Sequence, residues 1–157
     1  MILYHGSFIE ISRPDVVHSR KNIDFGCGFY TTSLYQQAEK WCEKYIRRGK
    51  DGFISIFRLN EKALEECRVL KFDTYSEEWL DFITACRMGS DTTAYDLIIG
   101  GVADDKVFNT CELYFKHYID KQAALDRLRF EKPNQQICFK NQETIERYLS
   151  FEGSERL

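Results

Sequence analysis

The chain has 157 residues, of which 43% are hydrophobic and 15% aromatic, and its formal net charge is −3. This length fits one ordinary domain with a single core, so we expect residues 1–157 to form one domain, and the two prolines argue against long linkers. The slightly acidic charge excludes an overall basic field for holding a nucleic-acid backbone, which leaves only a local patch for that role.

The spacing of the cysteines and the first residues of the chain indicate the cellular compartment. Six cysteines stand at wide, irregular intervals, without a CxxC pair. Zinc sites and small disulfide scaffolds use shorter spacings, so we expect reduced, mostly buried thiols and no metal. The chain starts with an apolar, strand-like segment instead of the basic and long apolar regions of a signal peptide, and no run reaches transmembrane length. We therefore expect a cytoplasmic protein without membrane contact.

In the first half of the chain, short strands alternate with one long amphipathic helix. Met1–Tyr4 is strand-like, and a polar connection follows it. Ser33, with Gln36 three residues later, predicts a capping box at the start of a helix that ends near Gly49. The β-branched and aromatic content after this helix predicts two further strands, at 53–59 and 68–72.

The second half continues the mixture of helices and strands. Ser76 opens a helix whose first turn is acidic, and Tyr95–Gly100 is the most strand-like run of the chain. Either Asp104 or Asp105 caps the next helix. The remaining expected elements are a helix at 120–130, a turn at 133–134, a strand at 135–139 and a helix that Asn141 caps and that extends through Leu149. Without a regular βαβ phosphate loop, this order predicts an α+β domain rather than a doubly wound sheet.

Two motifs near the N-terminus carry the functional argument. The first strand ends in His5-Gly6-Ser7, and 24–32 reads Asp-Phe-Gly-Cys-Gly-Phe-Tyr-Thr-Thr. The two glycines of this second motif flank Cys27 where a backbone turns or lets a ligand approach, because glycine alone enters positive φ without steric cost. An aromatic residue, Trp41, follows on the next helix, and a polar residue starts a late strand.

These features resemble the His-Tyr-Glu class of ADP-ribosyltransferases, the class that contains diphtheria toxin and the poly(ADP-ribose) polymerases. Nearly the whole chain is also similar to a family of small bacterial proteins of the same superfamily, whose recurring blocks correspond to 24–32, 95–105 and 136–139. The resemblance implies an α+β fold with a split pair of antiparallel sheets, helices outside them and an NAD cleft between them.

The resemblance also implies how NAD is held. His5 would hydrogen-bond the ribose, the Gly6 backbone would hold the nicotinamide carboxamide and Ser7 would support it. Tyr30 and Trp41 would sandwich the nicotinamide ring, whose departure develops oxocarbenium charge on the sugar. The remaining expected NAD-binding residues are Arg20, near the pyrophosphate, Asp24, Gly28, Phe29 and Thr31.

The expected glutamate is missing from the late strand, which offers Gln135 and Gln136 instead. We prefer Gln136, because the adjacent Ile-Cys-Phe matches the bacterial family, whereas an overlay on the polymerases favours Gln135. Strand alternation sends the two side chains to opposite faces, so at most one faces the ligand. A neutral amide can orient a 2′-hydroxyl but cannot act as a base, which argues against polymer extension. Asp104 or Asp105 could supply the missing carboxylate.

Each of these residues also has a purely structural interpretation. His5 could be a satisfied polar residue at a strand end, Tyr30 could pack in the core, and Trp41 lies on an apolar helical stripe. Arg20 and Asp24 could form no more than a loop ion pair.

We expect NAD-dependent mono-ADP-ribosylation of an intracellular target, in the context of the toxin half of a bacterial toxin–antitoxin pair, which would make a cognate antitoxin a partner. One alternative is a non-catalytic module that binds NAD or ADP-ribose after loss of the glutamate. Another is a protein-interaction domain that uses the same cleft shape without a nucleotide. The acceptor, whether protein, nucleic acid or small molecule, has no signature in the sequence.

Overall fold

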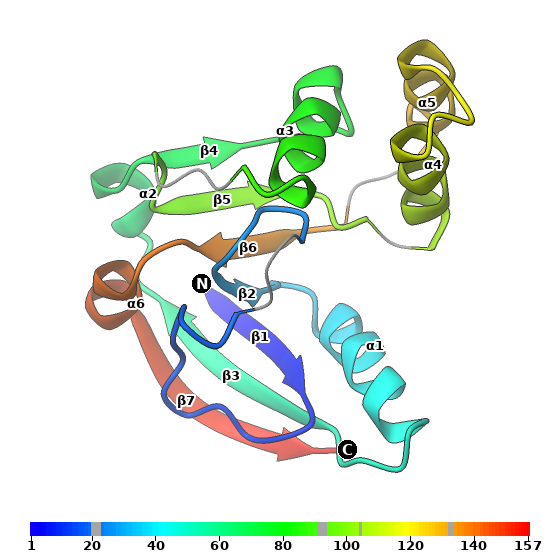
Figure 1. The fold of residues 1–157 in the computed structure, drawn as a ribbon. Coiled ribbons are helices and arrows are strands. Elements are labelled where there is room, and N and C mark those ends of the chain that lie inside the picture. Colours follow the sequence, from blue (N-terminus) through cyan, green and yellow to red (C-terminus); the bar gives the residue numbers. More distant parts are fainter. Residues whose placement is uncertain (20–22, 91–93, 104, 132–133) are drawn as a thin grey trace.

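The computed structural model describes residues 1–19, 23–90, 94–103, 105–131 and 134–157 (Figure 1). Within these residues, seven strands form two sheets, and six helices accompany them, which confirms the α+β prediction. In Figure 1 the four-stranded sheet lies above the three-stranded sheet, and both chain ends belong to the lower one.

The three-stranded sheet is antiparallel throughout. It contains β1 (Ile2–Ser7), β3 (Phe53–Leu59) and β7 (Leu149–Arg156), in the order β1-β3-β7. The strand expected at 53–59 is therefore confirmed. The last helix, however, ends at Tyr148, and the residues from Leu149 onward form an edge strand that the sequence analysis did not predict. This strand is mostly exposed, so it lacks the apolar alternation that marks a half-buried strand.

The four-stranded sheet has the order β2-β6-β5-β4. It consists of β2 (Phe29–Thr31), β6 (Gln136–Phe139), β5 (Leu97–Gly100) and β4 (Val69–Lys71). Neighbouring strands are antiparallel except β4 and β5, which are parallel, so the expectation of two antiparallel sheets is wrong for this pair. The α3 helix lies between β4 and β5 in the chain and provides the long connection that a parallel pair needs.

Two of the helices begin at side-chain caps that the sequence predicted. Ser76 accepts a hydrogen bond from the Trp79 N–H, and Asn141 accepts one from the Thr144 N–H, so both caps are confirmed. The six helices are α1 (Tyr35–Ile46), α2 (Ala63–Glu66), α3 (Glu77–Arg87), α4 (Asp105–Phe115), α5 (Lys121–Leu128) and α6 (Gln142–Tyr148).

The capping box expected at Ser33 is wrong. The residue at the N-cap position of α1 is Leu34, which makes no side-chain cap, and its N–H donates instead to the Thr32 hydroxyl at 3.0 Å. The Ser33 hydroxyl donates to the side-chain oxygen of Gln135, just before β6. A long-range polar contact has therefore replaced the local cap.

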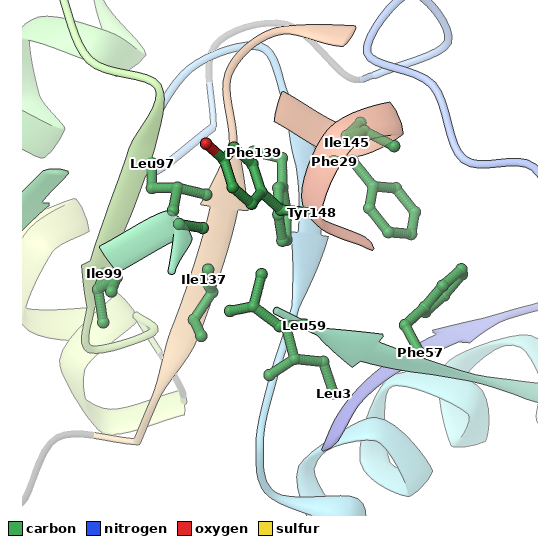
Figure 2. Close-up of a cluster of buried hydrophobic side chains, with 11 residues drawn as sticks. Leu3, Phe29, Phe57, Leu59, Leu97, Ile99, Ile137, Phe139, Ile145 and Tyr148 are labelled. Atoms are coloured by element: carbon green, nitrogen blue, oxygen red, sulfur yellow. The ribbon is translucent and has the colours of Figure 1, made fainter. Parts of the chain in front are cut away.

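The main core lies between the two sheets, and Figure 2 shows its side chains. Phe57 and Leu59 enter it from the lower sheet, and Ile137 and Phe139 enter it from the upper sheet. Full burial of each such side chain contributes roughly 1.5–3 kcal/mol. Residues that alternate with these on each strand face away from this core.

Two further clusters cover the opposite faces of the sheets. Under α3, α4 and α5, the buried residues include Trp79, Ile98 and Cys138. Under α1, Ala38 and Cys42 pack against Ile54 of β3. The molecule is thus layered as α1, lower sheet, main core, upper sheet and the group of α3, α4 and α5.

The structure bears on two further expectations, the state of the cysteines and the absence of membrane spans. All six cysteines are thiols without a disulfide bond, and four of them are buried, which agrees with the prediction of mostly buried thiols. Within the described residues, no helix has the length and apolar character that spanning a bilayer requires.

Candidate functional site

The histidine of the first motif contacts the second motif directly. The His5 Nδ1 atom lies 2.7 Å from the Tyr30 carbonyl oxygen, and the His5 ring lies 4.6 Å from the Phe29 ring, centroid to centroid. Burial lowers the pKa of His5 below its ordinary value, so the imidazole is neutral at neutral pH. A neutral ring that bonds a carbonyl through Nδ1 carries its proton there, which leaves Nε2 as a hydrogen-bond acceptor.

The strands that carry the two motifs separate just before Gly6. Tyr4 and Thr32 exchange two backbone hydrogen bonds, of 2.7 and 2.9 Å, and form the bridge between the sheets. Backbone groups of alternate strand residues project from the same edge, so the Gly6 N–H and C=O project toward β2 as well. They lie beyond the bridge, where β1 and β2 no longer pair. The Gly6 N–H can donate to the oxygen of a planar carboxamide while the Gly6 C=O accepts from its N–H.

Gly6 also has a structural reason to be glycine. A Cβ atom at this position would lie 2.3 Å from the Ala38 carbonyl oxygen and 3.0 Å from the Trp41 Cβ atom. Helix α1 therefore packs directly on the Gly6 backbone, and any side chain here would push the helix away.

The Trp41 indole stands beside this glycine and is half-buried. Its helix neighbours Ala38 and Cys42 belong to a core cluster, but Trp41 belongs to none of the three clusters. It also forms no ring pair with an aromatic residue in the part of the chain that the structure describes. Trp41 therefore lies outside the core clusters, and its expected contact with NAD stays a prediction.

The hydroxyl of Tyr30 is hydrogen-bonded within the fold. The hydroxyl donates to the Gly26 carbonyl at 2.6 Å and accepts from the Phe25 N–H at 3.1 Å. Burial raises the pKa of this phenol, with the nearby Cys138 and Asp24 adding to the shift, so it stays protonated. The Tyr30 ring is partly buried, and part of its surface packs on the cluster under α3, so core packing accounts for one side of it.

The glycine turn before β2 is fixed by contacts that the sequence analysis missed. The Lys140 Nζ atom donates to the carbonyl oxygens of Phe25 and Cys27, at 2.7 and 2.5 Å. A Cβ atom at Gly28 would lie 2.4 Å from the Cys138 Sγ atom, so β2 and β6 approach too closely for a side chain. Gly26 has a φ of +72°, which favours glycine. An ammonium group and close packing thus hold Tyr30 in place.

The two glutamines before and in β6 make contacts in different parts of the fold. Gln136 is buried, and its Nε2 atom lies 3.4 Å from Asp24 Oδ2 and 3.3 Å from the Gly101 carbonyl oxygen. Cys138 is opposite Tyr30 in the ladder, and residues two apart share a face, so Gln136 lies on the same face as Tyr30. Our preference for Gln136 over Gln135 as the residue that faces NAD stays a prediction.

Gln135 is held near the start of α1 instead. Its side-chain oxygen accepts from Ser33, and its backbone carbonyl accepts from Gln37 Nε2 at 3.1 Å. Gln37 is buried, and its own amide oxygen has no hydrogen-bond partner among the described residues.

Among the described residues, Asp24 has an ion-pair partner that the sequence analysis did not identify. Asp24 pairs with Arg87 of α3, 2.7 Å from Asp24 Oδ1 to the guanidinium, and Arg87 also lies 3.5 Å from Glu112 of α4. Arg20 and Asp104 fall outside the described residues, and for Asp105 only its place at the start of α4 is described. Arg87 gave no signal in the sequence, since a basic residue in the last turn of a helix is ordinary.

The remaining predicted residues have contacts within the fold. Phe29 belongs to the main core, and the Thr31 hydroxyl donates to the Ile137 carbonyl at 3.1 Å. Ser7 is buried, and its carbonyl accepts a weak hydrogen bond from the Cys42 thiol. Their expected contacts with NAD stay predictions.

A pocket in the structure lies away from the predicted site, and the described residues form no metal site. A pocket of about 570 Å³ is lined by Met1 and by residues in and just after β3, in α6 and in β7, among them Arg58 and Tyr148, and contains none of the predicted site residues. Among the described residues, no group of three or more potential ligands is placed to hold a metal ion.

The comparisons with known proteins give one finding. The model of a family described as a protein of unknown function, DUF3990, matches residues 1–151. Searches of curated proteins and of solved structures give no match.

Proposed function

The chain belongs to the DUF3990 family of proteins of unknown function, and from the geometry of its site we propose that it is an NAD-dependent mono-ADP-ribosyltransferase. The observation that carries the proposal is the 2.7 Å contact between His5 Nδ1 and the Tyr30 carbonyl. It joins two motifs that are separate in the sequence and that the resemblance assigns to one ligand. The two-sheet α+β fold is consistent with the split sheets that the resemblance implies.

Four groups would hold the nicotinamide riboside part of NAD. Nε2 of neutral His5 would accept a hydrogen bond from a ribose hydroxyl, and the Gly6 backbone would pair with the carboxamide. The rings of Tyr30 and Trp41 would contact the nicotinamide ring, which is cationic in NAD and is attracted to aromatic faces. The position of Trp41, half-buried and outside the three core clusters, supports this role.

The chemistry would be a substitution at C1′ of that ribose. The bond between C1′ and the nicotinamide nitrogen breaks, and its electron pair leaves with neutral nicotinamide. A nucleophile of the acceptor forms the new bond to C1′ and releases its proton to solvent. Because positive charge develops on the sugar, fixed polar groups near the 2′-hydroxyl stabilise the transition state. Gln136 is neutral and supplies no base, which favours transfer of a single unit or hydrolysis over chain extension.

The experiment incubates the purified chain with NAD and measures free nicotinamide, then treats a cell extract with the chain and labelled NAD and identifies modified acceptors by mass spectrometry. His5→Ala and Tyr30→Ala are expected to abolish nicotinamide release. His18→Ala is the matched control, because the His18 side chain is 88% exposed. NAD binding without release would indicate a binding module, and no NAD binding would contradict the proposal.

A toxin role makes a cellular prediction. Expression of the chain in bacteria is expected to arrest growth, and the His5→Ala variant is expected not to. A protein that restores growth and binds the chain would be its antitoxin. Equal growth arrest by both forms would argue against an NAD-dependent toxin.

A further inference from the structure

Asp24 connects four segments that are distant in the sequence. Its Oδ1 atom accepts two hydrogen bonds from the Arg87 guanidinium, of 2.7 and 3.2 Å. Its Oδ2 atom accepts from the Ala103 N–H at 3.1 Å and from Gln136 Nε2 at 3.4 Å. The Asp24 side chain is only 13% exposed, so these contacts are little screened by water. One carboxylate thus ties the turn before β2 to α3, to the residues after β5 and to β6.

The surroundings of Gln136 allow only one orientation of its amide. The two groups beside Nε2 are the Asp24 carboxylate and the Gly101 carbonyl, and both can only accept hydrogen bonds. Turning the amide over would place its oxygen against these two oxygens. The Gln136 oxygen therefore faces away from Asp24.

We infer that Asp24 is a positioning residue, which holds the Gln136 amide so that its oxygen, and not its nitrogen, is presented to the ribose 2′-hydroxyl. This inference rests on the proposed function. It explains how a glutamine could stand where relatives of the resembled class carry glutamate: the hydroxyl meets an oxygen acceptor in either case. A carboxylate on Asp24 is what makes the amide, rather than a second carboxylate, the side chain that fits at position 136.

The inference predicts an unusual outcome for the variant that restores the glutamate. In Gln136→Glu, an ionised carboxylate would face Asp24 and the Gly101 carbonyl, and like charges this close raise the pKa of one member. If the introduced carboxyl group is protonated, it would donate to Asp24 and present its other oxygen, as the amide does. Among the described residues, the other charged or titratable groups near Asp24 are Arg87 with Glu112, which already pair, and the protonated Tyr30 and Cys111.

The first measurement is the pH profile of nicotinamide release between pH 5 and 8.5. Gln136→Glu is expected to be active at acid pH and to lose activity at least tenfold as the pH rises through the raised pKa of the introduced carboxyl group. The wild type is expected to show no such loss. In the double variant Asp24→Asn/Gln136→Glu, the opposing carboxylate is gone, so the midpoint should move down by about one pH unit or more. A structural role of Asp24 would lower activity at every pH and would not move a midpoint.

A second measurement needs no activity. The carboxyl carbon introduced at position 136 is followed by ¹³C NMR in both variants without NAD, and its midpoint is expected to be raised in the single variant and lowered again in the double one. If Gln136→Glu does not fold at pH 7.5, it is expected to fold at pH 5.5, because a raised carboxyl pKa costs stability as the pH rises.

The two proposals fail in different ways. If the wild type releases no nicotinamide while the introduced carboxyl group titrates with a raised midpoint, the proposed function fails but the amide positioning stands. A midpoint for that carboxyl group that is ordinary, or that Asp24→Asn leaves unmoved, overturns the inference.

Discussion

His5 and Tyr30 meet through a ring nitrogen and a backbone carbonyl, 2.7 Å apart, while their side chains leave different strands. The hydrogen bond fixes the tautomer of the neutral His5 ring. Since burial lowers the pKa of His5 in the folded chain, the folded state resists protonation that the unfolded chain accepts near pH 6.5.

The first prediction concerns acid stability. The contribution of neutral His5 is complete above about pH 6.5 and is lost as the pH falls from there toward the lowered pKa, by about 1.4 kcal/mol for each unit of lowering. His5→Gln cannot titrate, so its melting temperature should fall less between pH 7.5 and pH 5 than that of the wild type. His18→Gln, at an exposed position, should follow the wild type. Parallel profiles for wild type and His5→Gln would contradict the prediction.

The second prediction concerns the contact between β1 and α1. Gly6→Ala should lower the free energy of unfolding by at least ~2 kcal/mol, because its Cβ would lie 2.3 Å from a backbone oxygen of α1. Gly49→Ala is the comparison, since no atom lies within 4 Å of the new Cβ and only its φ of +72° opposes it. That variant should lose about 1 kcal/mol. Urea denaturation measures both, and equal losses would show that α1 can move.

The third prediction separates the two tryptophans. Trp41→Ala should weaken NAD binding about tenfold or more while the free energy of unfolding changes by less than ~1.5 kcal/mol, because the indole lies outside the core clusters. Trp79 is fully buried and donates to the Gly101 carbonyl, so Trp79→Ala should cost about 3–5 kcal/mol.

Fluorescence checks this assignment, because the chain has only these two tryptophans. NAD should quench the emission of the wild type and should leave that of Trp41→Phe unchanged. Quenching that survives in Trp41→Phe would place the ligand away from Trp41.

The fourth prediction concerns the turn before β2. Lys140→Met should lower the free energy of unfolding by about 2–3 kcal/mol, because two carbonyl oxygens lose a charged donor. It should also weaken NAD binding, since the turn holds Tyr30. Lys121→Met removes exposed ion pairs with Glu77 and Asp81, which solvent screens, so it should lower stability much less than Lys140→Met does. Thermal unfolding and NAD titration of the two variants provide the test.

Local signals in the sequence were reliable where a residue acts on its own neighbours. The caps at Ser76 and Asn141 and the strand at 53–59 are examples, since each depends on a few adjacent residues. The capping box predicted at Ser33 is wrong because the Ser33 hydroxyl donates to Gln135, 102 positions away. Strand β7 was not predicted because an exposed edge strand needs no apolar face and so leaves no alternating pattern in the sequence.

The candidate site divides in the same way. The motifs at His5 and Tyr30 were assigned to one site through their resemblance to a known family, and the fold brings them into contact. The pairing of Asp24 with Arg87 spans 63 positions and depends on where α3 packs, which no local pattern encodes. Alternation predicted that Gln135 and Gln136 would point apart, but only the ladder with β2 assigns Gln136 to the face of Tyr30.

The close fit of α1 on Gly6 changes how other chains with this architecture should be compared. The packing of α1 alone requires a glycine at position 6. A glycine at the corresponding position of another protein therefore does not indicate that a dinucleotide is bound. The large aromatic at position 41 is under no such steric demand. Under the proposed function, the identity of residue 41 is therefore the better marker for distinguishing chains that bind the dinucleotide from chains that share only the fold.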